Sequence, residues 1–167
     1  MRILVLSIFI SFFASQVYSA CDESPTKEVD YTGCNLSENL EWAGVNLQGA
    51  QMEGINMSLS NLEKSQINNA NMMSGNFVFT NFNSSNLVSS NMQFANCYSA
   101  NFDYSNLAKV NLEGANLYLA SFKGANLFEA NLLGANISGA IFDEANLSNA
   151  IWIDGKKCAL GSIGSCE

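Results

Sequence analysis

Large apolar residues recur at every fifth position from Trp42 to Trp152, and this is the dominant pattern in the 167-residue chain. The period holds for twenty-three consecutive apolar positions, which we call centres. The residue before the centre is Asn in seventeen of these units, and the residue before that is usually small. An amphipathic helix places apolar residues about every 3.6 positions and a half-buried strand every second position. The pattern therefore predicts a short repeat rather than ordinary helices or strands.

The repeat resembles the pentapeptide-repeat family, whose motif is A(D/N)LXX. Matching segments include "ANLYL", "ANLFE", "ANLLG" and "ANISG", and the resemblance covers roughly residues 40–153. Departures such as "ASFKG" and "AIFDE" keep the apolar centre. The resemblance implies an all-β fold: a right-handed quadrilateral β-helix of about five to six coils of twenty residues. The centre and the small residue two positions before it would then point inward.

A four-sided coil makes a prediction that the sequence itself tests, because stacked residues should recur every twenty positions. Sorting the centres at that spacing places four phenylalanines in one set: Phe82, Phe102, Phe122 and Phe142. Leu or Ile fills the whole of the next set, from Leu47 to Leu147. The twenty-residue period therefore supports a four-sided coil independently of the resemblance.

The column of Asn residues has a structural explanation. Asn has poor strand propensity but tolerates turn geometry, and stacked Asn side chains can hydrogen-bond from coil to coil. We therefore expect the column to hold the coils together. The alternative is that the Asn side chains form a recognition surface.

Residues 1–19 read as a secretory signal peptide. Their apolar stretch, Ile3–Ala14, is too short to span a bilayer as a mature helix. Cleavage after Ser19 places Val17 and Ser19 at the −3 and −1 sites that signal peptidase recognises. Cleavage after Ala20 would instead place the bulky Tyr18 at the −3 site. We therefore expect an exported protein, periplasmic or extracellular, with no transmembrane segment in the mature chain. A lipid anchor on Cys21 meets the same objection from Tyr18 and is the less favoured alternative.

The segments that flank the repeat are expected to cap it, because an open coil exposes core and unpaired backbone. Residues 20–39 should form an irregular N-terminal cap, and residues 154–167, rich in Gly and Ser, a C-terminal closure. In an oxidising compartment, the cysteine spacing suggests two disulfides, Cys21–Cys34 and Cys158–Cys166. The fifth cysteine, Cys97, occupies a centre and is expected to be buried filler.

Charge and composition narrow the range of functions. The formal net charge is −8, which disfavours nucleic acid and anionic membranes as partners. The chain has no His, no CxxC and no phosphate-binding loop. Adjacent carboxylates such as Asp143 and Glu144 are expected to be solvent-exposed surface residues rather than catalytic groups. We therefore predict no catalytic residue, no cofactor and no metal site.

The outward positions of the fourth face are the exception to a mostly polar surface. They carry an apolar and aromatic set that we predict to be an interface: Leu59, Val78, Phe79, Tyr98, Tyr118 and Leu119. The expected function is a non-catalytic structural or protein-binding solenoid that associates with an unknown protein or with itself. One alternative is a DNA mimic that binds topoisomerases, as some members of the family do. The other is an enzyme or a carbohydrate-binding β-helix.

Overall fold

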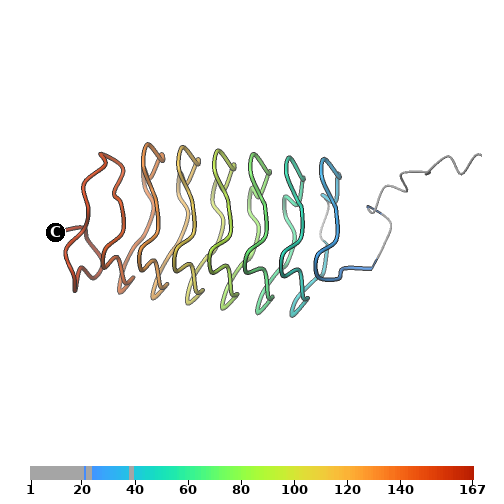
Figure 1. Ribbon diagram of the computed structural model, residues 1–167, viewed down its shortest axis with the longest axis horizontal. Helices are drawn as coiled ribbons and strands as arrows, with labels where there is room; N and C mark the ends of the chain where they lie inside the picture. The colour runs from blue at the N-terminus through green and yellow to red at the C-terminus, as the bar shows by residue number, and fades with distance from the viewer. Residues whose placement is uncertain (1–20, 22–23, 38–39) are drawn as a thin grey trace, which may run out of the picture.

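A computed structural model describes residues 21, 24–37 and 40–167, and it is a β-solenoid of stacked four-sided coils (Figure 1). Successive coils pair through isolated parallel bridges, and the described residues contain no strand longer than a single bridge position. From Glu41↔Asn61 to Asn131↔Ile151 each bridge joins residues twenty positions apart. We number the sides by their centres: side one holds Phe102, side two Leu107, side three Leu112 and side four Leu117.

Each bridge rests on two backbone hydrogen bonds that point along the rod. The N–H of a centre donates to the C=O of the Asn in the next coil, as from Leu62 to Asn81 at 2.8 Å. The N–H of that Asn donates to the small residue of the preceding coil, as from Asn81 to Ser60 at 3.0 Å. Successive coils therefore pair as parallel strands do.

The corners explain why five residues make one side. The N–H of the next small residue donates back to the C=O of the centre, as from Ser65 to Leu62 at 3.2 Å, and closes a four-residue turn. The second residue after the centre has a positive φ at every fifth position from 44 to 149. This is the signature of a type II turn, in which Gly or Asn fits best. Bulky residues also occupy this position, among them Phe79 at φ 55°.

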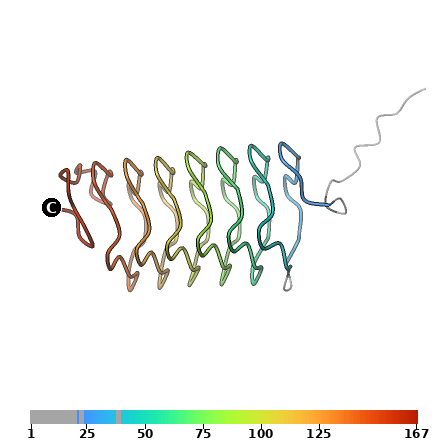
Figure 2. The same cartoon turned by 90° about the horizontal axis from the view of Figure 1, so that it is seen from below.

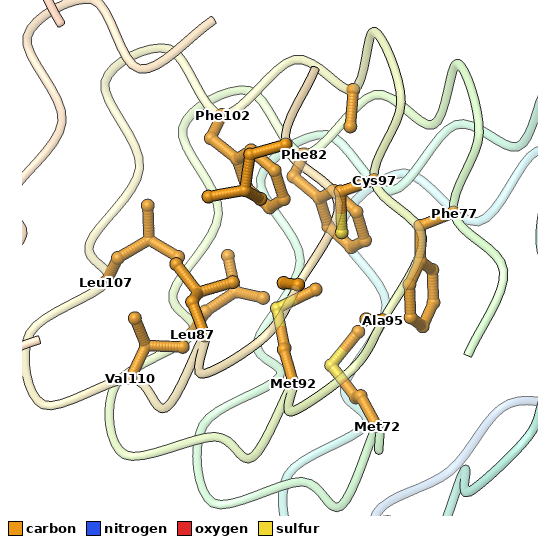
Figure 3. Close-up of a cluster of buried hydrophobic side chains, with 14 of the residues drawn as sticks. Met72, Phe77, Phe82, Leu87, Met92, Ala95, Cys97, Phe102, Leu107 and Val110 are labelled. Atoms are coloured by element: carbon orange, nitrogen blue, oxygen red, sulfur yellow. The ribbon is translucent and has the colours of Figure 1, made fainter. Parts of the chain in front are cut away.

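The inward residues form one continuous core (Figure 3). The side-one phenylalanines stack face to face at the coil spacing, with ring centroids 4.9 to 5.0 Å apart and planes within 6° of parallel. Trp152 covers the last of them, with its ring edge-on to Phe142 at 5.4 Å. The twenty-residue period read from the sequence is therefore confirmed as a physical column of side chains.

The Asn side chains join the coils, as expected. Asn116 is representative: its Nδ2 donates to Asn96 Oδ1 at 3.0 Å in the preceding coil. Its Oδ1 accepts from Asn136 Nδ2 at 3.3 Å and from the Tyr118 N–H at 3.3 Å. Each such Asn therefore supports both the neighbouring coil and its own turn.

Regular stacking begins earlier than residue 40. Asp30 and Asn35 already form parallel bridges, each with a partner 21 rather than 20 positions away. Tyr31 takes a centre position and is fully buried, with its ring 5.6 Å from that of Trp42. One extra residue between Asn35 and Glu41 therefore shifts the sequence pattern without ending the stack.

The C-terminal segment packs against the far end of the rod, where Figures 1 and 2 place the C-terminus. It turns back and forms two antiparallel bridges, Ile151↔Lys157 and Asn146↔Ile163. The two expected disulfides, Cys21–Cys34 and Cys158–Cys166, are present, one in each end segment. The described residues include no helix long and apolar enough to cross a membrane.

Candidate interface on side four

The residues predicted as an interface lie together on the outer surface of side four. Phe79 meets Tyr98 edge-on at 5.4 Å, and Tyr98 stacks on Tyr118 at 5.7 Å with the ring planes 17° apart. Val78 stands in the same column as the two tyrosines, one coil before Tyr98, because the coil period is twenty residues. The fold therefore builds an aromatic column on the surface that parallels the one in the core.

The corner beside this column carries the more exposed members of the set. Leu59, Phe79 and Leu119 occupy the corner between sides four and one and are 52%, 53% and 46% exposed. Tyr118 is 39% exposed, whereas Val78 and Tyr98 are half-buried. We call these six residues the side-four patch.

Side four carries no Asp, Glu, Lys or Arg in the five coil segments from Ile55 to Gly139. The chain as a whole carries a formal net charge of −8. Apolar burial rather than charge pairing would therefore dominate recognition at this surface.

The sequence interpretation missed a second group of exposed aromatic corner residues. Phe94, between sides three and four, is 59% exposed, and Tyr104, between sides one and two, is 58% exposed. Each lies over a glycine one coil later: a Cβ on Gly114 would come within 2.6 Å of the Phe94 ring, and one on Gly124 within 2.8 Å of Tyr104. A large corner residue followed twenty positions later by Gly is the signal that would have found them.

Groups with catalytic or metal-binding potential are dispersed. Cys97 is fully buried at its centre position, as expected for filler, and burial raises the pKa of its thiol well above the usual range. Asp143 and Glu144 are exposed on side one. In the described part of the chain, no group of three or more His, Cys, Asp or Glu side chains is placed to hold a metal ion.

The charged column on side one tests the coil register. Lys123 lies in register with Asp103 and Asp143: the Lys123 N–H donates to Asp103 Oδ1 at 3.0 Å, and the Gly124 N–H donates to the Asp143 C=O at 2.8 Å. The ion pairs recorded for the described residues use other lysines: Lys64, Lys109 and Lys156. The register is therefore confirmed, although Lys123 forms no close ion pair with either carboxylate.

The model of the family described as "Pentapeptide repeats" matches the chain with eight copies, in ranges that run from residue 43 to residue 151. The chain belongs to the pentapeptide-repeat family. The resemblance read from the sequence is thereby confirmed over more than half of the chain.

Solved structures of other pentapeptide-repeat proteins are similar to this one. Rfr23 from the cyanobacterium Cyanothece 51142 is 26% identical over 74% of this chain and 90% of its own, with a TM-score of 0.54. HetL from Nostoc sp. strain PCC 7120 is 25% identical over 78% and 73% of the two chains, with a TM-score of 0.28. Full-length QnrB1, a plasmid-mediated fluoroquinolone resistance protein, is 18% identical over 81% and 80%, with a TM-score of 0.42. A search of curated protein sequences gives no match.

Proposed function

We propose that this pentapeptide-repeat protein is an exported, non-catalytic scaffold that binds a protein partner, or a second copy of itself, through the side-four patch. The observation that carries the proposal is an uncharged row of apolar and aromatic side chains on the outside of a fully packed core. Contiguous apolar surface of this kind marks interfaces in soluble proteins.

The energetics of the patch favour binding. Phe and Tyr bury large areas, and rings already stacked on a rigid coil lose little conformational freedom when a partner covers them. The corners that hold Leu59, Phe79 and Leu119 do not require apolar residues, since Lys64, Ser84 and Asn149 take the same left-handed conformation at other corners.

The two alternative functions have less support from the geometry. A sugar-binding platform needs an open ring face, whereas Tyr98 and Tyr118 stack on each other, so each ring has one face covered by the other. A DNA mimic needs a regular array of carboxylates in place of phosphates. The charged column of side one alternates instead, with Lys123 between Asp103 and Asp143.

The sharpest test compares two surfaces of the same rod. Replacing Phe79 and Tyr118 together by Ser should abolish self-association in sedimentation experiments, or capture of a partner from the exported fraction. Lys123→Ser on side one should leave both unchanged. None of these residues is a centre, so both variants should keep the circular dichroism and unfolding transition of the parent. A folded double variant that associates normally would rule out the patch.

Export is part of the proposal and has its own test. The leader-like residues 1–20 lie outside the described residues, so the support comes from their sequence and from the two disulfides, which are typical of oxidising compartments. N-terminal sequencing of the mature protein should begin at Ala20, and peptide mapping should find both disulfides. A lipid on Cys21 would use the thiol that pairs with Cys34, so a lipidated N-terminus would overturn this assignment.

A further inference from the structure

The C-terminal segment covers only two of the four sides at its end of the rod. On side three the Trp152 N–H donates to the Lys156 C=O at 2.7 Å, and the Cys158 N–H donates to the Ala150 C=O at 2.8 Å. Side two repeats this arrangement with equivalent bonds, Leu147 N–H to Ser162 C=O and Gly164 N–H to Ala145 C=O, both at 2.9 Å. An antiparallel segment thus satisfies the centre N–H and the C=O of the inward small residue on each covered side.

Sides four and one present the same pairs of groups without such a segment. On side four these are the Ile137 N–H and the Ala135 C=O, and on side one the Phe142 N–H and the Ala140 C=O. Among the described residues, none of these four groups has a backbone hydrogen-bond partner. Two adjacent sides of the last coil therefore form an open β-edge.

The core is also incompletely covered at this edge. Every inward residue from Leu47 to Ala150 is buried except two, Ile137 and Ala140, which are half-buried. On the covered sides, Cys158 and Ser162 of the C-terminal segment are buried against the last coil. An apolar side chain over Ile137 would complete the core on the open side.

We propose that an extended segment of a partner protein pairs antiparallel with this edge, with an apolar residue over Ile137 and a basic residue beside Asp143 and Glu144. Strand addition to an exposed edge is a common mode of peptide recognition, in which the main chain supplies affinity and alternate side chains supply specificity. We expect a basic residue because Asp143 and Glu144, at the side-one end of the edge, are exposed carboxylates that would attract a positive charge.

A second copy of this chain is the less suitable occupant. Glu167 lies across the closure, since its C=O accepts the Ala159 N–H at 2.8 Å and its N–H donates to Ser162 Oγ at 3.3 Å. Figure 1 shows the C-terminus projecting from this end of the rod. Two rods placed end to end would therefore bring their exposed, negatively charged Glu167 side chains together.

The protein's own closure supplies a defined probe. Residues 155–164 cover two consecutive sides. The same stretch with Val at positions 158 and 162, the peptide Gly-Lys-Lys-Val-Ala-Leu-Gly-Val-Ile-Gly, would place its lysines on side one and an apolar inward residue over Ile137. Labelled peptide titrated with the full protein should bind saturably by fluorescence anisotropy, and Gly-Glu-Glu-Val-Ala-Leu-Gly-Val-Ile-Gly should bind at least about fivefold more weakly. Failure of the lysine peptide to bind, or equal binding of both peptides, would overturn the proposal.

Variants of the protein locate the peptide. An inward charge blocks edge pairing, so Ile137→Lys should weaken binding at least about tenfold, whereas Ile163→Lys, on covered side two, should not. Amide exchange on the parent protein needs no variant: peptide should slow exchange at Ile137 and Phe142 and leave Leu147 and Trp152 unchanged. Exchange unaltered at Ile137 would contradict the proposal even if Ile137→Lys failed to fold.

Two further outcomes separate this edge from the other surfaces. The Phe79→Ser and Tyr118→Ser double variant should bind the peptide as the parent does. The proposal for the edge can therefore hold even if the side-four patch proves not to be an interface. In sedimentation experiments without peptide, the parent protein should either be monomeric or associate to the same extent as Ile137→Lys. Association of the parent that Ile137→Lys abolishes would identify a second copy as the occupant and overturn the proposal.

Discussion

Two aromatic columns run along this rod, one inside side one and one outside side four. The inner rings and the Tyr98–Tyr118 pair follow the twenty-residue period, with ring spacings of 4.9 to 5.0 Å inside and 5.7 Å outside, and Phe79 joins the outer rings from the neighbouring corner at 5.4 Å from Tyr98. The inner rings are buried and nearly parallel, whereas the outer rings are partly exposed and vary in tilt. Stacking is thus a consequence of the repeat in both places, but only the inner column is enclosed. The difference separates residues that hold the fold from residues available for binding.

The largest expected effect is loss of an inner ring. Phe102 stacks between Phe82 and Phe122, so Phe102→Ala removes two ring contacts and leaves a cavity that the rigid coils cannot close. We expect a loss of about 3–5 kcal/mol in the free energy of unfolding, measured by denaturant titration. Tyr118→Ala is the outer counterpart and should cost less than about 1 kcal/mol. Equal losses would erase the distinction between the columns.

A tight inner site sharpens the same distinction. A Cβ on Gly75 would lie 2.5 Å from Cε2 of the buried Phe77 ring and 3.1 Å from the Met72 C=O. Gly75→Ala should therefore destabilise by about 1–3 kcal/mol through overpacking. Adding Phe77→Leu gives the Ala-x-Leu combination that Ala115 and Leu117 form on the same side, and it should recover part of that loss. If the effects of the two substitutions on the free energy of unfolding simply add, the clash with the Phe77 ring is not the cause of the loss.

The outer Asn column should have an intermediate effect. Asn116→Ala removes the hydrogen bonds to Asn96 and Asn136 and the bond that supports the Tyr118 N–H. We expect a loss of about 1–2 kcal/mol, because these groups are only partly shielded from water. Thermal unfolding measures the loss, and Ser138→Ala on the same side, which removes no recorded side-chain bond, is the control. A variant as stable as the parent would mean that backbone pairing alone holds the coils.

The smallest effect concerns an exposed carboxylate. The Lys156 backbone N–H, 3.1 Å from Asp154 Oδ1, and the nearby ammonium group hold the pKa of Asp154 below its ordinary value of 3.8. A lowered pKa stabilises the native state above that ordinary value, and the contribution is lost as the pH falls through the folded value. The melting temperatures of the parent and Asp154→Asn should therefore converge once the pH falls below the lowered pKa of Asp154. A difference that stays constant across the pH scan would exclude this carboxylate as its source.

The sequence predicted the core far better than the ends. Its centres and the four-sided register follow from strict spacing, because a repeat that buries every fifth residue leaves little choice of register. In the end segments only the two cysteine pairs were predicted, from their short separation in sequence. The start of the stack was missed because one extra residue before Glu41 breaks the five-residue count without breaking the pairing. The right-handed sense and the number of coils stay predictions of the resemblance.

The surface was predicted in part. Alternation within the repeat places the six patch residues outside, but it does not reveal that Phe94 and Tyr104 lie over glycines of the next coil. Nor does it reveal the open edge at Ile137, because that depends on how far the C-terminal segment reaches across the last coil. Such features arise from contacts between coils or with the C-terminal segment, and the five-residue pattern of the sequence does not predict them.

The bonds that join successive coils all point along the axis of the rod, and this has a mechanical consequence. A pull on the two ends is shared by the four sides of a coil but passes through the coils one after another. The rod should therefore lengthen in steps as single coils open, each releasing about 60 Å of extended chain. Under load, a rod built in this way would therefore extend in steps whose length is fixed by its twenty-residue period.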